Sequence, residues 1–436
     1  MKDNENLSAA LAAATCALLG SAVTTPVAAQ EEGSGSGWSF DSTLLYYGES
    51  DDRVRDISAA VAALRDFGDE RKLSATLTAD TLTGASASGA IALNRPQTFT
   101  SPSGRAVYTT AAGDVPLDDT FLDTRFALNA SWTQPLARLY TFSAGVGFST
   151  EYDYTHLGAN LALARDFNKR NTTLSAGVAW SQDDVDPVGG RPLPLSQMLD
   201  VGNNGNKRGG GESKDVLDLL LGFTQVLNRT TVLRVNYSYS DSSGYLNDPY
   251  KLLSVVDPLT GDTLARVPIG QGPNGVYLFE SRPDARTKQS LYAEVKHSFG
   301  DPVMYFSYRY MTDDWGIDSH TGEVRLRWPL GEGYIEPQLR YYKQSAADFY
   351  RASLVSGSAL PRYASADFRL GDFDATTVGI KYGHGTPNGN EWSIRAEYYQ
   401  QTGSVPSEQI IGNQANRALY PDLSAVIVQF GYRFRP

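Results

Sequence analysis

The chain of 436 residues carries a formal net charge of −11, and 20% of its residues are charged while 41% are hydrophobic. That composition does not fit a disordered chain, and the acidic balance argues against nucleic acid as a partner, because phosphate binding requires clustered Lys and Arg. No apolar run after residue 30 approaches the ~18 to 20 residues that a membrane-spanning helix needs. Helical membrane spans are therefore not expected beyond residue 30.

The N-terminal segment 1–29 has the features of a signal peptide. Lys2 precedes a weakly apolar stretch, and Val27-Ala28-Ala29 places small residues where a signal peptidase cleaves. We expect cleavage before Gln30 and a short periplasmic segment at 30–37, with a short N-terminal membrane anchor as the alternative. The single cysteine of the chain lies inside the segment to be removed, so the mature protein is expected to contain neither disulfides nor Cys-ligated metal.

From Trp38 onward the dominant pattern is two-residue alternation, which predicts strands with one apolar and one polar face. In the last such segment the apolar face carries Val426, Val428, Phe430, Tyr432 and Phe434, and the polar face carries Gln429, Gly431 and Arg433. Strands of this kind suit a soluble antiparallel sheet with one wet face as well as a membrane barrel. The lengths of the connections decide between the two.

The expected strands are joined by connections of two kinds. Seven short turns rich in Gly, Pro, Asn and Asp lie near residues 67–69, 134–136, 168–170, 228–229, 300–302, 330–332 and 386–389. The opposite connections are brief near 48–53, 151–154 and 313–318 and long near 84–120, 184–214, 244–285, 346–370 and 403–420. Short turns at one end and loops of unequal length at the other are typical of outer-membrane barrels, and this count predicts about 16 strands with both termini on the short-turn side.

We therefore predict an all-β fold: a transmembrane antiparallel up-and-down β-barrel over residues 38–436, with short periplasmic turns and long extracellular loops. The expected location is the Gram-negative outer membrane, after signal-peptide cleavage. The Ala-rich segment 57–64 could form a short helix, but we interpret it as a strand. Aromatic residues near strand ends are expected at the membrane interfaces; they are Tyr46-Tyr47, Tyr341-Tyr342, Tyr398-Tyr399, Trp132, Trp180, Trp315, Trp328 and Trp392.

The last strand resembles the C-terminal assembly signal of bacterial outer-membrane barrels. In that signal a polar residue, a Gly and alternating apolar residues precede a terminal aromatic residue, and Gln429, Gly431 and Phe434 match, whereas Pro436 departs from it. The resemblance implies recognition by the barrel assembly machinery and surroundings of outer-membrane lipid and lipopolysaccharide. Porins of this size are often trimers, so a homotrimer is one expected assembly.

A second resemblance lies nearer the N-terminus. The segment Leu44-Leu45-Tyr46-Tyr47-Gly48-Glu49, followed after a hairpin by a motif containing Asp80, Gly84, Ala85 and Ser86, resembles a Gram-negative family of outer-membrane β-barrels described only as a domain of unknown function. Ala87 stands where that family would have Pro. The resemblance implies neighbours such as a small Cys-containing lipoprotein, a thioredoxin-like protein and a periplasmic flavin transferase, hence an envelope redox or metal-handling setting, and it supplies no catalytic residue and no cofactor.

If the apolar faces meet lipid, the alternate residues line the lumen. The earlier strands contribute small groups: Ser143, Gly145, Gly147, Asn160, Gly177 and Ala179. The later strands contribute charges: Arg234, Glu294, Lys296, Arg309, Glu323, Arg325, Arg327, Glu336, Arg340, Arg395, Glu397 and Arg433. Fixed charges in a pore filter polar solutes, so we predict a pore for small polar solutes whose lumen is constricted by residues 84–120 or by the Gly-rich segment 202–211. The alternative interpretation is that neighbouring Arg and Glu merely neutralise one another.

Other functions have weaker signals. The acidic stretches at Asp183, Asp241 and Asp313 lack the spacing of a calcium loop, and the four histidines, His156, His297, His320 and His384, have no metal-ligand spacing. Asp313, Asp314, Asp318 and His320 fall near one expected surface loop, where a rim protease would place its acid-base residues. We expect no enzyme, metal or cofactor; the main alternative to a pore is a non-transport anchor or interaction scaffold that works with periplasmic redox or metal-handling partners.

Overall fold

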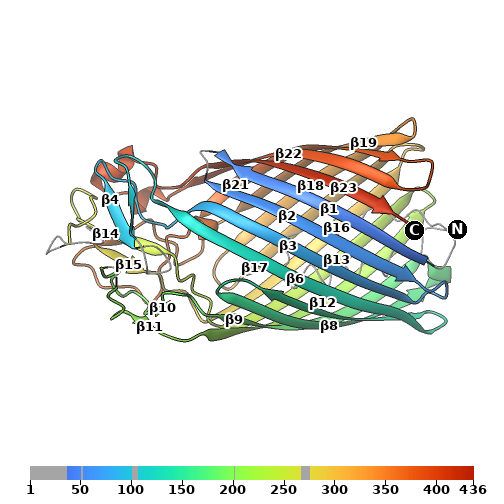
Figure 1. The fold of residues 1–436 in the computed structure, drawn as a ribbon, viewed down its shortest axis with the longest axis horizontal. Helices are drawn as coiled ribbons and strands as arrows, with labels where there is room; N and C mark the ends of the chain where they lie inside the picture. The colour runs from blue at the N-terminus through green and yellow to red at the C-terminus, as the bar shows by residue number, and fades with distance from the viewer. Residues whose placement is uncertain (1–36, 51–52, 101–106, 201, 267–274) are drawn as a thin grey trace.

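A computed structural model describes residues 37–50, 53–100, 107–200, 202–266 and 275–436. Sixteen antiparallel strands close into a barrel in which the last strand pairs with the first (Figure 1). The predicted fold class and strand number are thus confirmed, and the first strand begins and the last strand ends at the short-turn end of the barrel (Figure 1). The expected signal peptide and all but the last residue of the segment 30–37 lie outside the described residues. Within the described part of the chain, no helix has the length and hydropathy of a membrane span.

The barrel strands are β1 (Gly37–Glu49), β2 (Val54–Asp66), β3 (Lys72–Ala87), β6 (Leu117–Ala137), β7 (Tyr140–Thr150), β8 (Tyr154–Phe167), β9 (Thr172–Val185), β12 (Glu212–Asn228), β13 (Thr231–Gly244), β16 (Ala285–Ser298), β17 (Val303–Asp313), β18 (Asp318–Leu330), β19 (Gly333–Gln344), β21 (Asp372–Gly385), β22 (Glu391–Ser404) and β23 (Leu423–Phe434). A short 3-10 turn, η2 (Asn168–Arg170), joins β8 to β9. The Ala-rich segment 57–64 is part of β2, so its interpretation as a strand is confirmed.

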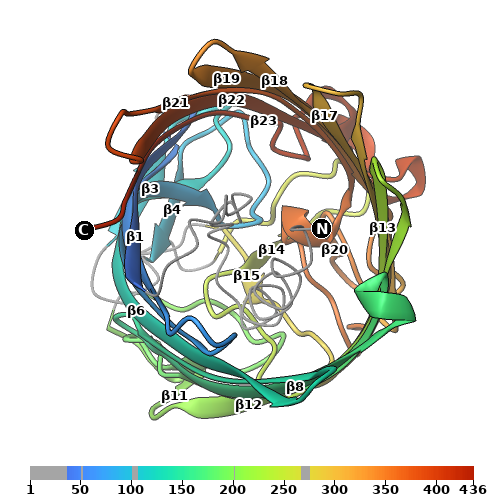
Figure 2. The ribbon, with the colours of Figure 1, turned by 90° about the vertical axis from the view of Figure 1, so that its right-hand side faces the viewer.

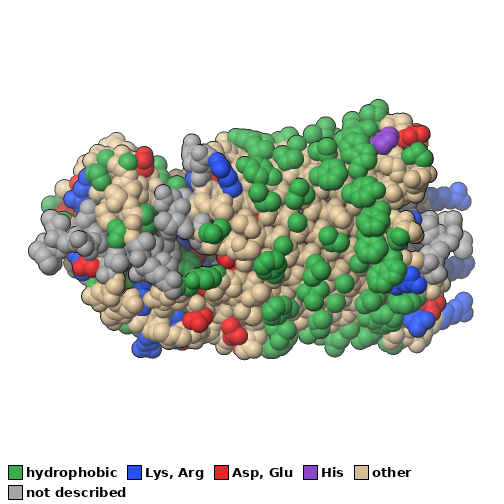
Figure 3. All heavy atoms as spheres, viewed as in Figure 1, with side chains coloured by type: hydrophobic (Ala, Val, Ile, Leu, Met, Phe, Trp, Pro, Cys, Tyr) green, Lys and Arg blue, Asp and Glu red, His purple; other side chains and the backbone are tan. Residues whose placement is uncertain are grey.

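The outer surface of the barrel is apolar because alternate residues of each strand point away from the lumen. Leu77, Val146 and Phe430, for example, are exposed on this face. Exposure of such side chains to water would be unfavourable, whereas exposure to lipid is not. Figure 3 shows hydrophobic side chains over the barrel wall, with a dense band near the end that carries the short turns. A closed ring with an apolar exterior satisfies every strand's backbone groups in lipid, which is the requirement for a membrane-spanning sheet.

Each of the three predicted tyrosine pairs sends one ring outward and one into the lumen. The outward members are Tyr46, Tyr341 and Tyr398, at 42%, 48% and 50% exposure. Each inward member donates a hydrogen bond to the residue two positions later: Tyr47 to Glu49 at 2.8 Å, Tyr342 to Gln344 at 2.6 Å and Tyr399 to Gln401 at 2.6 Å. The prediction of interface aromatics is therefore wrong for the inward half of each pair, because side chains in a strand alternate between faces.

Two further predictions need correction. The turn expected at 134–136 lies instead at residues 138–139, because β6 continues through Pro135 by means of a register shift between Pro135 and Ala137. A bulge of this kind tolerates a proline that cannot donate to the ladder. Trp315, expected at the membrane interface, is only 4% exposed inside the loop region, where its indole nitrogen donates to the Ala285 carbonyl at 2.8 Å.

The five long extracellular loops pack together into one folded lobe, here called the cap. Figure 1 shows it beyond one end of the barrel, and the view along the barrel in Figure 2 shows its strands crossing the area enclosed by the ring. Its elements are β4 (Gln97–Thr100), β5 (Val107–Thr110), β10 (Arg191–Pro192), β11 (Lys207–Arg208), β14 (Leu252–Val256), β15 (Tyr277–Phe279), β20 (Leu354–Val355), η3 (Phe368–Leu370), η4 (Ser407–Gln409) and η5 (Gly412–Asn416). The sheet β15-β14-β20 combines strands from two different loops.

The cap has hydrophobic cores of its own, which most extracellular loops lack. Phe99, Leu253 and Tyr277 have no exposed surface, and they belong to clusters that join three loops. A third cluster packs Trp315 against Phe349 in the loops after β17 and β19. Because these side chains are removed from water while the barrel turns its own apolar residues toward lipid, the water-excluding interior of this protein lies in the cap.

Gly84, one of the predicted family-motif residues, lies where β3 passes from the barrel toward the cap. Its φ of +117° is a conformation that side chains other than glycine rarely adopt, and the register between β3 and β6 shifts at this point. A Cβ atom here would lie 1.9 Å from the Arg53 carbonyl oxygen. In the same motif Asp80 forms an ion pair with Arg125 of β6 at 2.9 Å. The motif therefore shapes the exit of β3 from the barrel.

We expect Gly84→Ala to destabilise the folded barrel by roughly 1–3 kcal/mol, because the new methyl group must displace backbone and hold a strained φ. The matched control is Gly322→Ala in β18, where a Cβ would meet no atom within 4 Å. Urea unfolding followed by the heat-modifiable gel shift of the folded barrel measures both. Equal midpoints for the two variants would contradict the role assigned to Gly84.

Candidate functional site: the lumen and its cap

The lumen wall is built from the inward residues of the barrel strands. All twelve charged residues predicted for the lumen lie at the positions that alternate with outward apolar side chains; Arg325, for example, lies between Val324 and Leu326. They occupy β13, β16 to β19, β22 and β23, which form one side of the ring. The small residues predicted for the opposite wall lie on β7, β8 and β9, and Ser143, Asn160 and Ala179 among them are buried.

Part of the charged wall is neutralised by ion pairs within and between strands. Arg234 lies 3.7 Å from Glu294. The guanidinium of Arg325 lies 2.9 Å from Glu323 and 3.9 Å from Glu336. Arg395 lies 3.3 Å from Glu336 and 3.1 Å from Glu397, while Arg433 lies 2.9 Å from Asp41 of β1. The four predicted lumen glutamates are thus all engaged by arginines.

Several of the other cations of this wall rest on tyrosine rings. Arg327 lies 3.5 Å from the ring centroid of Tyr334, and Lys381 lies 5.7 Å from the same centroid. Arg309 is held over Tyr292 at 5.5 Å in the same manner. Within the described residues, none of these three cations has a carboxylate within 4 Å, and the same holds for Lys296 and Arg340. This side of the lumen therefore carries an excess of positive charge.

The opposite side of the extracellular mouth is acidic. Glu151 and Asp153, in the short loop between β7 and β8, lie near Asp123 of β6. Burial, together with the negative charge of Asp123, raises the pKa of Glu151 to about 7. The same two causes raise the pKa of Asp153 to about 6. Negative charge at this rim therefore grows as the pH passes from 5 to 8.

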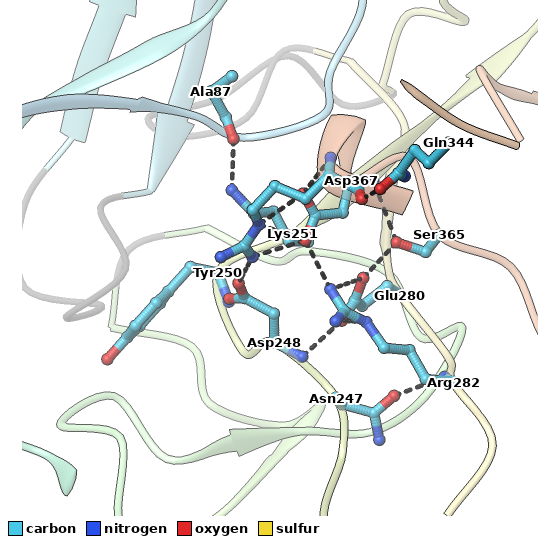
Figure 4. A network of polar contacts seen from close by, with 11 residues as sticks. Ala87, Asn247, Asp248, Tyr250, Lys251, Glu280, Arg282, Gln344, Ser365 and Asp367 are labelled. Atoms are coloured by element: carbon cyan, nitrogen blue, oxygen red, sulfur yellow. Dashed lines mark hydrogen bonds and ion pairs between the residues drawn. The ribbon is translucent and has the colours of Figure 1, made fainter. Parts of the chain in front are cut away.

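An ionic network in which Lys251, Glu280 and Asp367 are buried holds three loops of the cap together (Figure 4). Arg282, in the loop before β16, lies 2.6 Å from Glu280 and 2.8 Å from Asp367, which belongs to the loop before β21. Arg369 also binds Asp367 and reaches Asp248 at 2.6 Å. Lys251 donates to the Ala87 carbonyl at 2.6 Å and so adds the loop after β3. We call this set the cap lock.

Each buried charge of the cap lock depends on the oppositely charged groups beside it. Asp367 is buried, which by itself would raise its pKa, but Arg369, Lys251 and Arg282 together lower the pKa below its usual value. Burial raises the pKa of Glu280 to about 7 despite Arg282 beside it. Removing one member of such a set leaves an uncompensated buried charge, at a cost of about 3–5 kcal/mol. The lock therefore favours one closed arrangement of the cap loops.

The segments predicted to constrict the lumen take part in the cap. Residues 88–116 contribute β4 and β5, and the Ser88 carbonyl accepts a hydrogen bond from the Leu252 amide at 2.8 Å. In the Gly-rich segment 202–211, residues 203–205 and 209–211 are exposed, and Gly209 and Gly210 have open space where a side chain would lie. The first segment thus covers the mouth with other loops, whereas much of the second faces solvent.

The residues considered for a rim protease do not converge. Asp313 points inward, where it binds Arg286 and accepts from the Trp315 amide at 3.0 Å. Asp318 and His320 lie on the outer face of β18 and bond to tyrosines of β17 instead. Among the described residues, no group of three or more His, Cys, Asp or Glu side chains could hold a metal ion. The geometry thus gives no shared acid-base site at this rim.

Three sets of residues in this region were not predicted from the sequence. The lumen tyrosines, such as Tyr292 and Tyr334, share the parity of the charged residues beside them, so the same alternation could have indicated them. The acidic rim was missed because the earlier strands were described only by their small residues; Asp123 and Arg125 have inward parity on β6 and were a usable signal. The cap lock had no local signal, since its members come from separate loops.

We expect Glu151→Gln to become more stable than the natural protein as the pH rises through about 7. An acid whose pKa is raised on folding favours the folded state at low pH and loses that contribution when it ionises. After allowance for solvent screening, the difference between pH 5 and pH 8 should be of order 1 kcal/mol. Unfolding midpoints at the two pH values measure it, with Glu332→Gln on an exposed periplasmic turn as the control; a pH-independent difference would contradict the prediction.

Comparison with known proteins identifies a family and names no function. No curated protein matches the chain. Among solved structures, the chain is similar to a bacterial polysaccharide outer membrane secretin (9% identity, TM-score 0.44, 92% of this chain and 99% of that one), to OccK5 (OpdH) of Pseudomonas aeruginosa (9%, 0.40, 92% and 98%) and to the CymD monoaromatic hydrocarbon channel (9%, 0.39, 92% and 89%). A family model matches residues 8–434, which confirms the resemblance drawn from the Asp80 to Ser86 motif. The chain therefore belongs to the family described as "Protein of unknown function (DUF3570)".

Proposed function

We propose that this outer-membrane barrel is a gated channel for small polar solutes and that its lumen favours those carrying negative charge. The observation that carries the proposal is the excess of cations on one side of the lumen, where arginines and lysines rest on tyrosine rings without a carboxylate partner among the described residues. A lumen wall with a purely structural role could have every cation paired with a carboxylate. Unpaired cations in a pore select solutes by charge.

The geometry around these cations supports a role in passage. Tyr334 lies between Arg327 and Lys381, and its hydroxyl donates to Glu391 at 2.8 Å, which fixes the ring. A guanidinium stacked on a fixed ring keeps its N–H groups free to meet an anionic group passing by. The small residues on the opposite wall leave room for such a solute, and a barrel of about 16 strands is wide enough for an aqueous channel.

Charge reversal tests the selectivity. We expect Arg327→Glu, alone and together with Arg309→Glu, to shift ion selectivity in planar bilayers toward cations, with the larger shift in the double variant. The matched control is Arg229→Glu, on an exposed periplasmic turn, which should leave the selectivity within about 20% of the natural value. Unchanged selectivity in the double variant would show that these residues do not face the permeation path.

The cap supplies the gate in this proposal. We expect Asp367→Asn to loosen the cap by roughly 3 kcal/mol, since Arg282 and Arg369 lose their shared carboxylate. The open probability in planar bilayers should then rise, and protease should cleave the cap loops faster, while the barrel keeps its heat-modifiable gel shift. Asp301→Asn, on an exposed periplasmic turn, is the control. A loosened cap with no conductance at all would overturn the channel proposal.

A second candidate function is a non-transport anchor whose cap binds a partner. It is favoured by the extent of the cap's buried cores and by Leu259, which is 85% exposed at a turn braced by Asp257. The periplasmic lipoprotein or thioredoxin-like partners implied by the family resemblance would meet the short-turn end of such an anchor, not its cap. It predicts no conductance from either the natural protein or Asp367→Asn, and co-purification of a partner that is lost in Leu259→Asp.

A further inference from the structure

A groove on the outer wall of the barrel combines an apolar floor with a cationic end. Its volume is about 620 Å³, and it runs over β8, β9, β12 and β13 on the lipid-facing side. Ala176 of β9 makes the depression, because its register partners on either side are the larger Leu163 and Leu221. The groove lies on the opposite face of the wall from the lumen, so a role for it is independent of the proposed channel.

Arg165 lines the periplasmic end of this groove. Its guanidinium lies 5.0 Å from the ring centroid of Tyr140 and 4.6 Å from that of Phe167. The side chain is exposed on the outward face, and none of the described carboxylates lies within 4 Å of it. A guanidinium held between two rings, next to apolar surface, can bind a phosphate through charge-assisted hydrogen bonds.

The position of Arg165 along the barrel axis indicates which anion it can meet. Arg165 lies three residues before the periplasmic turn that begins with η2, and its register partner Tyr140 is the first residue of β7. This is the level of the aromatic band, where a membrane's hydrocarbon gives way to headgroups. A phospholipid presents a phosphate at this depth, with acyl chains directed back along the groove.

We propose that the groove is a specific site for one glycerophospholipid of the periplasmic leaflet, with its phosphate on Arg165 and an acyl chain against Ala176, Leu163 and Leu221. The two halves of the site match the two halves of the ligand. Arg165 accounts for the headgroup charge, and the depression at Ala176 accounts for the chain. Ordinary lipid contact with the barrel needs neither feature.

Two substitutions test the headgroup contact at Arg165 and the acyl-chain contact at Ala176 separately. Native mass spectrometry of the detergent-extracted full-length protein would count bound dioleoyl phosphatidylglycerol, with the neutral detergent dodecyl maltoside as competitor. We expect Arg165→Gln to weaken lipid retention about tenfold through loss of the charge-assisted contacts, and Ala176→Phe to lower it by filling the groove. Arg65→Gln is the matched control, since Arg65 lies between Trp38 and Phe67 in the same band but does not line this groove.

Each outcome bears on the proposal. Selective loss in Arg165→Gln and Ala176→Phe, with retention in Arg65→Gln, would support a built site. Equal retention in all variants, or equal loss in Arg65→Gln and Arg165→Gln, would mean annular lipid only and would overturn it. Should Ala176→Phe fail to give the heat-modifiable gel shift of a folded barrel, Ala176→Leu is the second variant with the same expectation.

Discussion

The need to satisfy backbone hydrogen bonds inside a lipid layer governs this protein. A sheet in hydrocarbon cannot leave an edge unpaired, so β1 must meet β23, and the register from Phe40 opposite Phe434 to Glu49 opposite Ala425 closes the ring. Closure forces alternation on every strand, and alternation in turn separates an apolar exterior from a polar lumen. The lumen charges, the outward aromatics and the groove at Ala176 are all consequences of that one division.

Most of the barrel could be predicted from the sequence because each strand and turn is specified by residues close together in the chain. A period of two, the residues of the turns and the unequal loops are each readable within a few positions, and they indicated the strand number, the face of Arg327 and the ends of the hairpins. The errors arose where two adjacent residues on opposite faces were assigned to one face, as with Tyr46 and Tyr47, or where a bulge carried β6 past Pro135. Both depend on register, which a turn residue alone does not determine.

The cap could not be predicted in the same way, because its contacts join residues far apart in the chain. Arg282 and Asp367 are separated by 85 positions, and β14 pairs with β20 from another loop. Nothing in either segment alone indicates its partner. Trp315 illustrates the result: its type and its place near a strand end suggested the membrane interface, but the packing of loops around it made it part of a core.

The sheet β15-β14-β20 has a consequence for how this surface can change over time. Exposed loops of outer-membrane barrels ordinarily vary one by one, since each contacts mainly water. Here the loop after β13 supplies two strands and the loop after β19 supplies the third, while Ser88 and Thr260 bond across to further loops. An insertion or exchange in one loop therefore disturbs the others, so the extracellular face should diversify as a single unit, and phages or antibodies that recognise it would see coordinated replacement.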